Sequence, residues 1–546
     1  MRPRARLLTR RDLLRLGAAG AAGWAGVGCP APSAPAGSRR VVAGQIHGQD
    51  VSLAHVLRTD EPPRRPAASR EVDVLIVGAG VAGLTCAWRL HRAGVEAALV
   101  DVGADPGGNA RGGRSAVSAF PWGAHYLRAP TPEHPALERF LAEAGLLRGR
   151  DARGRLEWDT RAVCAAPQER VYEGGLWRRG LFPPPRSGTA AAAQALARFE
   201  GVVAGLAARR GADGARAFAI PADLSSRDPG LLALDEVSFG AWLDAEGFDD
   251  PALRWLLEYA CRDDYGCTLA TTSAWAGLHY FCARRTDDPT RDVVLTWPEG
   301  NGRLVRLLRE QAPVPFEGQT VCVRLLPGAS PGDSSEAWLL GPRRAERVVA
   351  RSLVWAGPQF VLGRVLPERP PHVDAFSYAP WLVANVTLER PPGGVGFELA
   401  WDNVFYGSPS LGYVVANRDG RGPTVVTWYL PLTGVDPRAE RRRLLDFTHR
   451  DVADLVLGDL LAVHPTLGPH VRSVDAWRWG HAMVRPVPGF LWGPDRAAAA
   501  SPPGALVVAN SDLSGIPVFE EAFYRGVLAG EQVLTRRGVA FESYLG

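Results

Sequence analysis

The chain of 546 residues is 46% hydrophobic and 22% charged, which is ordinary for a globular protein large enough for more than one domain. All 62 basic residues are arginine, which excludes chemistry that needs a lysine amine, and the seven cysteines show no CxxC spacing, so no metal site is expected. The net charge is +4 and falls to −1 without residues 1–28, which hold six arginines and one aspartate, so nucleic-acid binding has no electrostatic basis.

The N-terminus predicts an export signal. Residues 9–14, TRRDLL, resemble a bacterial twin-arginine signal, and the Ala- and Gly-rich run that follows is too short for a membrane span. Residues 26–29, GVGC, are similar to a degenerate lipobox with Cys29 as the lipid-modified first residue. Cleavage after Ala36 and an arginine-rich flexible start are the alternatives. We therefore expect an exported protein, either periplasmic or held at the membrane by a lipid anchor.

The strongest local pattern is a strand, a glycine-rich turn, a helix, a strand and an acid, in that order. Residues 72–77 form an apolar, β-rich run typical of a strand buried on both faces, and they end in the turn 78–83, GAGVAG. A helical stretch follows and stops at Gly94, and the apolar run 95–100 closes on Asp101. This order predicts an α/β fold that binds a dinucleotide. The alternative is a glycine-rich turn without a ligand.

Each glycine of the turn has a separate expected role. Gly78 permits the tight turn, Gly80 lets the backbone approach a pyrophosphate, and Gly83 lets the helix pack closely. The N-terminus of the helix faces the anion. Asp101 lies about 20 residues further on, where a carboxylate can accept hydrogen bonds from ribose hydroxyls.

A second glycine-rich loop, residues 103–114, follows the acid and carries two arginines. It can lie over a pyrophosphate, with Arg111 or Arg114 neutralising the charge. The alternative is a solvated loop.

A family resemblance adds to this pattern. Residues 78–113, GAGVAGLTCAWRLHRAGVEAALVDVGADPGGNARGG, are similar to the flavin-containing amine oxidase and phytoene desaturase superfamily, which places a GG[R] motif just after the ribose-binding acid. Asn109 stands where that family usually has arginine. The resemblance implies an FAD-binding, Rossmann-like domain of the glutathione reductase type, interleaved with an α+β substrate domain. It also implies noncovalent FAD, because no cysteine follows Cys322 to form the family's C-terminal cysteinyl link.

The middle of the chain carries weaker signals of the substrate domain. Helical apolar spacing covers 135–147, 190–209 and 251–260, and in this superfamily a helical insertion covers the substrate. The aromatic residues at 275–281 either line the cavity or form a core cluster. Residues 376–430 are strand-like and aromatic, as in a substrate-domain sheet. We expect this division: signal 1–29, linker 30–70 with a short ordered piece at 41–57, FAD-binding parts 71–130, 291–370 and 491–546, helical cap 131–290, and substrate-domain sheet 371–490.

The C-terminal part carries a second motif. Residues 506–512 form a strand that ends in Asp512, which stands where the family's acid bonds the ribityl–phosphate region. Residues 521–534 match the family's closing helix, GAxxSGxxAAxxVL, at its small and apolar positions. Small residues there would let the helix end approach the flavin, and its dipole favours the electron-rich ring edge. Glu521 replaces the family's glycine, a departure that could perturb the ring contact.

The resemblance, carried over position by position, implies a set of site residues. His125, in the segment FPWGAHY that looks like the family's passage beside the flavin ring, would act as a proton donor or base or would only hydrogen-bond. The implied catalytic residues are His125, Tyr126 and Phe519. The implied cofactor contacts are Gly78, Gly80, Val81, Ala82, Gly83, Asp101, Val102, Gly107, Gly108, Asn109, Arg111, Arg114, Pro121, Trp122, Gly123, Ala124, Val321, Ala356, Gly357, Asn510, Asp512, Pro517 and Ala522.

The expected chemistry is hydride transfer from a small-molecule substrate to FAD, with oxygen or another compound as the electron acceptor. An amine C–N bond is the first expectation. Against it, the oxidase branch uses a lysine beside the flavin and an aromatic cage, whereas this chain has no lysine and only Phe519 near the cage position. A desaturase, dehydrogenase or isomerase acting on an apolar substrate and a noncatalytic accessory flavoprotein are the alternatives. The oligomeric state is left open.

Overall fold

The computed structural model describes residues 42–48, 53, 55–58, 63–182, 190–342, 344–416 and 422–546. The chain divides into Met1–Val42 and one compact unit, Ala43–Gly546. The predicted export signal, Cys29 and much of the predicted linker lie outside the described residues. Among the helices of the described part, none combines the length and the apolar character needed to cross a membrane.

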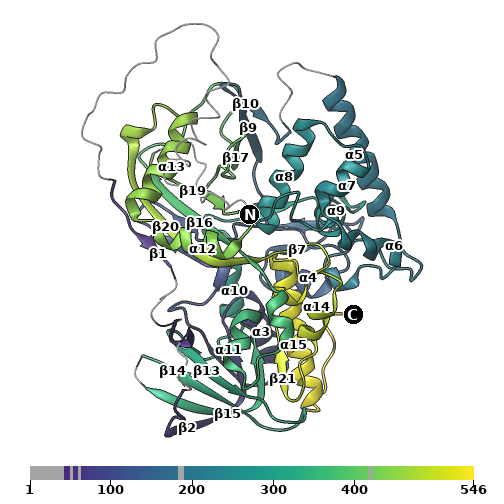
Figure 1. Ribbon diagram of the computed structural model, residues 1–546, viewed down its shortest axis with the longest axis vertical. Helices are drawn as coiled ribbons and strands as arrows, with labels where there is room; N and C mark the ends of the chain where they lie inside the picture. The colour runs from purple at the N-terminus through teal and green to yellow at the C-terminus, as the bar shows by residue number, and fades with distance from the viewer. Residues whose placement is uncertain are drawn as a thin grey trace, which may run out of the picture. The chain divides into compact units, whose positions relative to one another are not determined.

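A seven-stranded sheet carries the glycine-rich turn and lies in the lower part of Figure 1. Its order is β12 (Phe316–Glu317), β3 (Ala97–Val100), β2 (Ala68–Val77), β15 (Ala345–Trp355), β14 (Ser335–Leu340) and β13 (Val321–Leu326), with β21 (Leu506–Val508) paired to the end of β15. β12, β3, β2, β15 and β21 run parallel, so their carboxyl ends meet at one edge. Val74 to Val77 are buried, as the apolar run predicts for a strand covered on both faces.

Two helices that are far apart in sequence pack against each other on this sheet. They are α3 (Val81–Arg92), which begins directly at the glycine turn, and α15 (Phe519–Arg536). A Cβ added to Gly526 would lie 2.4 Å from the Ala82 carbonyl oxygen, and one added to Gly530 would lie 2.9 Å from Arg89 Cβ. Gly526 and Gly530 therefore serve the contact of the closing helix with α3, whereas Ala522, in its first turn, lines the cavity described below.

An eight-stranded sheet forms the second layer, in the upper left of Figure 1. Its order is β1 (Ile46–His47), β20 (Val471–Val484), β16 (Tyr378–Leu388), β19 (Thr424–Pro431), β18 (Tyr413–Val415), β17 (Asp402–Phe405), β9 (Glu169–Glu173) and β10 (Leu176–Arg179). The strands over 376–430 agree with the sequence pattern. By contrast, β9 and β10 lie in the segment 131–290, for which the sequence predicts mostly helix. β1 lies in the short ordered piece that the sequence predicts within the linker, at 41–57.

Helices on the right of Figure 1 form the cap: α4 (Pro135–Glu143), α5 (Ala190–Ala208), α6 (Pro229–Leu232), α7 (Phe239–Ala245), α8 (Pro251–Tyr265) and α9 (Ala274–Cys282). The helices predicted at 135–147, 190–209 and 251–260 are confirmed as α4, α5 and α8. Trp275 and His279 are buried in the cap core, whereas Tyr280 lines a pocket. The aromatic cluster at 275–281 thus divides between the two roles that the sequence left open.

Short elements complete the unit. The helices are α10 (Gly302–Gln311), α11 (Gln359–Val365), α12 (Pro437–Asp446), α13 (His449–Val463) and α14 (Pro494–Ala500). The two-stranded sheets are β4 (Gly112–Arg114) with β5 (Ala119–Pro121), β6 (Tyr126–Arg128) with β11 (Val294–Thr296), and β7 (Leu147–Arg150) with β8 (Leu156–Trp158).

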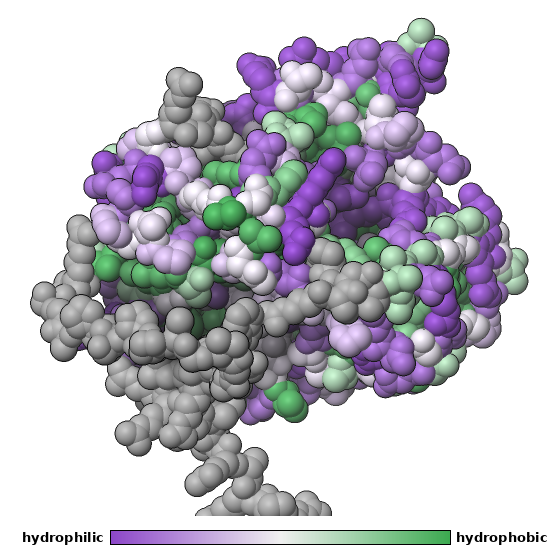
Figure 2. Space-filling view, turned by 90° about the horizontal axis from the view of Figure 1, so that it is seen from above, coloured by the Kyte–Doolittle hydropathy of each residue, from purple (hydrophilic) through white to green (hydrophobic). Residues whose placement is uncertain are grey.

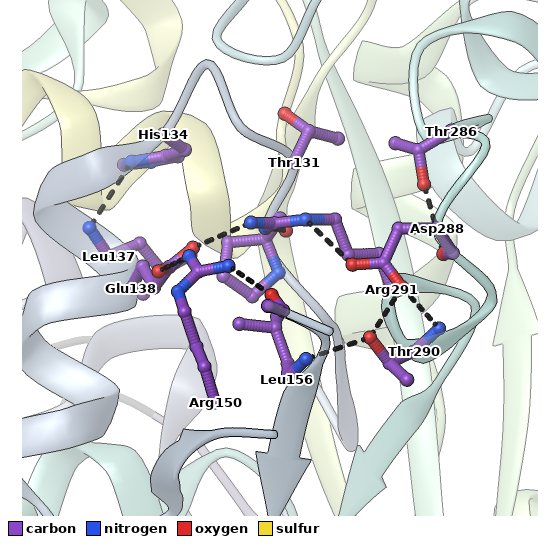
Figure 3. A network of polar contacts seen from close by, with 12 residues as sticks. Thr131, His134, Leu137, Glu138, Arg150, Leu156, Thr286, Asp288, Thr290 and Arg291 are labelled. Carbon is purple, nitrogen blue, oxygen red and sulfur yellow. Dashed lines mark hydrogen bonds and ion pairs between the residues drawn. The ribbon is translucent and has the colours of Figure 1, made fainter. Parts of the chain in front are cut away.

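A buried arginine, Arg291, connects the first helix of the cap, α4, with the segment that follows the last cap helix, α9. Figure 3 shows Arg291 between Glu138 of α4 and the turn at Asp288. Arg291 Nη2 donates to Glu138 Oε2 at 2.9 Å, and Nη1 donates to the carbonyl of Pro130. The backbone N–H of Thr290 donates to Asp288 Oδ1 at 2.9 Å and closes the turn. The buried guanidinium thus has both a carboxylate and a carbonyl partner, which offsets its desolvation.

The face seen from above in Figure 2 is covered mainly by hydrophilic residues, among which smaller groups of hydrophobic residues are scattered. A hollow with hydrophilic walls opens in this face (Figure 2). A mixed surface of this kind gives no sign of a large apolar docking area on the visible face.

Candidate active site

A cavity of about 670 Å³ lies where the carboxyl ends of the parallel strands face the second sheet. A ligand site at this edge is the general rule for open α/β sheets. Of the residues that the sequence assigned to the cofactor or to catalysis, those that line this cavity are Gly78, Gly80, Val81, Ala82, Asp101, Val102, Gly108, Asn109, Ala124, Val321, Ala356, Gly357, Asn510, Asp512, Pro517, Phe519 and Ala522.

The three glycines of the turn differ in what surrounds them. A Cβ added to Gly83 would lie 1.9 Å from the Gly78 carbonyl oxygen, and one added to Gly78 would lie 2.7 Å from the Ala356 carbonyl carbon. Protein packing therefore requires both of these glycines. A Cβ at Gly80 would meet nothing within 4 Å, and Gly80 has an ordinary φ of −71°. The space above Gly80 is thus left for a ligand, as a diphosphate against the N-terminus of α3 would need.

Asp101 holds the glycine turn and the second loop together. Its Oδ2 accepts from the backbone N–H of Ala79 and its Oδ1 accepts from that of Gly103, both at 2.6 Å. Burial raises the pKa of this carboxyl, and the two backbone hydrogen bonds oppose that rise. Because Asp101 also lines the cavity, its oxygens are placed for a ribose at the end of β3.

Two arginines proposed from the sequence for the pyrophosphate do not line the cavity. The Arg111 guanidinium donates to the Asp105 carbonyl and lies 5.0 Å from the ring of Trp477. Arg114 is exposed. The second loop therefore offers its backbone, through Gly108 and Asn109, rather than these two charges.

The remaining predicted contacts form a layer behind the cavity wall. The Gly107 backbone N–H donates to Ala79 oxygen at 2.7 Å, and the carbonyls of Trp122 and Gly123 accept from Trp479 Nε1 at 2.6 Å and Tyr429 Oη at 3.0 Å. Pro121 is buried within β5. Gly83, Gly107, Pro121, Trp122 and Gly123 thus support the segments that line the cavity.

The C-terminal motif places a buried carboxyl at the cavity. Asp512 Oδ2 accepts from Tyr378 Oη at 2.5 Å and from the backbone N–H of Gln359 at 3.0 Å, and burial raises its pKa to about 6. Glu521 is bonded elsewhere, because its Oε1 accepts from the Ala222 backbone N–H at 2.6 Å. The carboxylate that replaces the family's glycine is thus turned to the cap and does not line the cavity.

A second, smaller pocket of about 80 Å³ is lined in part by the residue that follows a lining residue of the first cavity. Ala124 lines the cavity and the next residue, His125, lines the pocket. The pocket lies between the cap and the second sheet and has a mostly aromatic and acidic wall. Its lining includes Tyr126, Glu169, Tyr259, Asp263, Tyr280, Trp401, Asp402, Tyr413 and Tyr429.

Three carboxyls of this pocket form no close ion pair, although Arg128 also lines the pocket and its charge favours the ionised form of Glu169. Glu169, Asp263 and Asp402 make no ion pair within the described ranges. Burial raises the pKa of all three. Repulsion adds to this effect, from Asp264 on Asp263 and from Asp263 and Glu169 on Asp402. By contrast, the adjacent Asp264 pairs with Arg284 at 3.3 Å.

His125 adds no charge to the pocket at neutral pH. Burial lowers its pKa to about 3, against a weak opposing hydrogen bond from the Gly123 backbone. Its ring centroid lies 4.7 Å from that of Tyr429 and 5.4 Å from that of Trp401. The pocket therefore presents three carboxyls, several tyrosines and a neutral imidazole against one guanidinium, that of Arg128. When ionised, the carboxyls complement a small cation.

Sequence reasoning identified the aromatic strands but not these acids. Glu169 and Asp402 lie on adjacent strands, β9 and β17, and Asp263 lies on α8, so only the fold brings them together. No local pattern distinguishes these carboxyls from surface acids. The described residues hold no group of three or more potential ligands for a metal ion.

Comparisons with known proteins agree with the architecture. A sequence model of an NAD(P)-binding Rossmann-like domain matches residues 76–144. Comparison with curated proteins found no match to the sequence. Three solved structures cover 85–86% of this chain: putrescine oxidase bound to putrescine (17% identity, TM-score 0.64, 100% of that chain), cyclohexylamine oxidase from Brevibacterium oxydans (15%, 0.62, 100%) and a CLA-producing fatty acid isomerase from P. acnes (15%, 0.58, 98%). The predicted fold class, a Rossmann-like domain interleaved with a second domain, is confirmed.

Proposed function

We propose that the protein is a flavin-dependent oxidoreductase that holds FAD noncovalently and takes hydride from the C–N bond of a small organic amine. FAD, when bound, supplies the hydride acceptor. The residues fit such a group: Gly80 leaves open space at the N-terminus of α3, and Asp101 stands at the ribose position. Trp355 Nε1, in the cavity wall, is buried and has no partner among the described residues, so it is available to a polar ligand.

The acidic, aromatic pocket next to His125 supports an amine as substrate. Two carboxyls without cationic partners, Asp263 and Asp402, would hold an ammonium group, and the tyrosine rings around them would add cation–π attraction. Because the backbone passes directly from Ala124 in the cavity to His125 in the pocket, a molecule held by these acids would lie beside the cofactor cavity. This arrangement supplies orientation and excludes water.

A desaturase or isomerase acting on an apolar substrate is the second candidate, favoured by one observation. The chain contains no lysine, whereas the oxidase branch that it resembles uses a lysine beside the flavin. The carboxyls of the pocket argue against an apolar substrate, because hydrocarbon offers no hydrogen bond to Asp263 or Asp402.

Visible spectroscopy of the purified full chain tests the proposal. Flavin bands that bleach when an amine is added without oxygen, and return in air, would support amine oxidation with oxygen as the acceptor. Alcohols of the same carbon skeleton are the matched control and should leave the bands unchanged. Bands that no amine bleaches would contradict the amine proposal, and a colourless protein that does not take up FAD would contradict the flavin proposal.

The binding of a small quaternary ammonium ion such as tetramethylammonium is expected to tighten as the pH rises to about 8 and then to level off. Burial and the neighbouring Asp264 raise the pKa of Asp263 to about 8, so at lower pH its carboxyl is neutral and attracts the cation weakly. Below this value the Kd should fall by up to about tenfold per pH unit, measured by flavin difference spectra. Asp263→Asn should flatten the profile. A wild-type profile without pH dependence would contradict the assignment.

We also propose that the chain is exported by the twin-arginine route and anchored through a lipid on Cys29, as its N-terminal motifs suggest. Mass spectrometry of the mature N-terminus tests this proposal. A diacylglycerol-modified Cys29 would support it, whereas cleavage after Ala36 would support export without the anchor. An intact N-terminus in a cell that has the export machinery would contradict it.

A further inference from the structure

The cofactor cavity has a cationic side that does not belong to the glycine-rich turns. Four arginines of the described chain line it. Three of them, Arg58, Arg364 and Arg441, act together on His481, and we refer to these three as the arginine cluster. None of them forms an ion pair with a carboxylate of the described chain. Arg441 Nη1 donates only to the carbonyls of Tyr378 and Gly480, both at 3.2 Å.

The charges of the arginine cluster all act on one cavity residue, His481. Burial lowers the pKa of His481 to about 3, and the positive charges of Arg441, Arg58, His55 and Arg364 lower it further. Burial also lowers the pKa of Arg441 to about 10. The charges of Arg438 and Arg58 add to this effect, and that of Asp436 opposes it. A cluster of cations that repel one another in a cavity is stabilised when an anion binds among them.

One member of the cluster comes from the segment before the first strand of the cofactor sheet. β1 pairs in parallel with β20, where the backbone N–H groups of Val474 and Ala476 donate to the Ala43 and Gln45 carbonyls at 2.9 and 3.0 Å. A Cβ on Gly44 would lie 2.0 Å from the Val474 carbonyl oxygen, so the approach of the two backbones requires glycine there.

The same segment remains docked beyond β1. The His47 ring lies 4.9 Å from Trp122 and stacks over Trp477 at 6.3 Å, and His55 and Arg58 of the short helix η2 (His55–Arg58) line the cavity. The short ordered piece that the sequence predicts within the linker thus contributes a wall of the cofactor cavity.

The charge balance of the cavity identifies the anion. A dinucleotide brings a diphosphate to the N-terminus of α3, whose dipole supplies only part of a positive charge. Arg111 and Arg114, the cations expected from the second glycine-rich loop, do not line the cavity. We propose that Arg58, Arg364 and Arg441 neutralise this diphosphate, so that the N-terminal segment is part of the cofactor site. The inference rests on the proposed dinucleotide but not on the amine substrate.

A charged group of the substrate is the other possible source of the anion. The pocket argues against it, because the residues that face His125 are acidic and line a different space from the arginine cluster. An anionic substrate would meet Glu169, Asp263 and Asp402 there. A diphosphate at the N-terminus of α3 would meet no such repulsion, because it would lie in the cavity that the arginine cluster lines.

Titration of the full apoprotein with FAD, ADP and adenosine tests the inference. The variants are Arg58→Gln and Arg441→Gln, and the matched control is Arg114→Gln, an exposed arginine that does not line the cavity. Each cluster variant should weaken FAD and ADP by about 10- to 100-fold and lower the salt dependence of both. Affinity for adenosine, which has no phosphate, should stay unchanged, and the control should bind all three ligands as the wild type does.

The opposite results overturn the inference. FAD and ADP affinities within about threefold of the wild type in both cluster variants would show that these arginines do not hold the diphosphate. Normal FAD affinity together with a lost spectral response of the holoprotein to benzoate would assign the cluster to another anion. Thermal unfolding of each apoprotein separates misfolding from lost affinity. If amines fail to bleach the flavin, the proposed amine substrate is wrong, but the inference about the diphosphate is unaffected.

Discussion

Replacement of Gly80 by alanine is expected to weaken FAD binding at least about 100-fold while the apoprotein unfolds at the wild-type temperature or slightly above it. The added methyl would meet no protein atom within 4 Å, and a φ of −71° suits alanine, so the folded apoprotein bears no strain. The methyl would instead occupy the space in which a diphosphate approaches the N-terminus of α3. FAD titration and thermal unfolding of the apoprotein measure the two effects separately.

Two further glycines serve as controls for this result. Gly83→Ala should prevent correct folding, because its Cβ would lie 1.9 Å from the Gly78 carbonyl oxygen. Gly201→Ala, on the cap helix α5, should change neither affinity nor fold, since nothing lies within 4 Å of its Cβ. If Gly80→Ala binds FAD with wild-type affinity, the dinucleotide does not lie against this turn.

The cofactor-binding half could be predicted from sequence because its signals are local. The strand, the glycine turn, the helix and Asp101 lie within about 30 residues, the usual length of such a unit. Their spacing fixes both the turn geometry and the position of the acid at the end of the next strand. The closing helix was also predictable from its small and apolar positions, although Gly526 and Gly530 turned out to serve the contact with α3.

The substrate side could not be predicted in this way because long-range pairing builds it. β9 joins the second sheet beside β17, more than 200 residues later, and this pairing brings Glu169 next to Asp402. β1 adds to the far edge of the same sheet from a segment whose composition is that of a linker. Neither pairing leaves a periodic pattern, since each strand is short and its register is set by its neighbours.

The largest effect on the substrate side is expected from Asp263→Asn and Asp402→Asn. Each should weaken the binding of a small ammonium ion by about 10- to 100-fold at a pH above the raised pKa values, because a charge-assisted contact is lost. Binding of FAD should be unchanged, since neither residue lines the cofactor cavity. Flavin difference spectra with tetramethylammonium measure the first effect, and FAD titration measures the second.

The stability of the same variants separates a binding role from a structural one. Burial raises the pKa of Asp263 and Asp402 in the folded protein, so folding stability declines as the pH rises above their ordinary value near 3.8. Removing either carboxyl should therefore raise the unfolding temperature at neutral and alkaline pH. Asp264→Asn is the matched control. Burial raises the pKa of Asp264 as well, but Arg284 lies 3.3 Å away and opposes the rise, so this variant breaks a buried ion pair and should destabilise the protein.

Comparison of Asp263→Asn with Asp264→Asn decides whether the pocket carboxyls bind a ligand or stabilise the fold. Acids retained at a cost to stability are typical of sites that bind a ligand, whereas an acid that stabilises the fold needs no ligand to explain it. If Asp263→Asn lowers the unfolding temperature as Asp264→Asn does, both carboxyls are structural and the pocket is not a cation site. If Asp263→Asn gains stability and loses affinity for the ammonium ion, the pocket holds its acids for a cationic substrate.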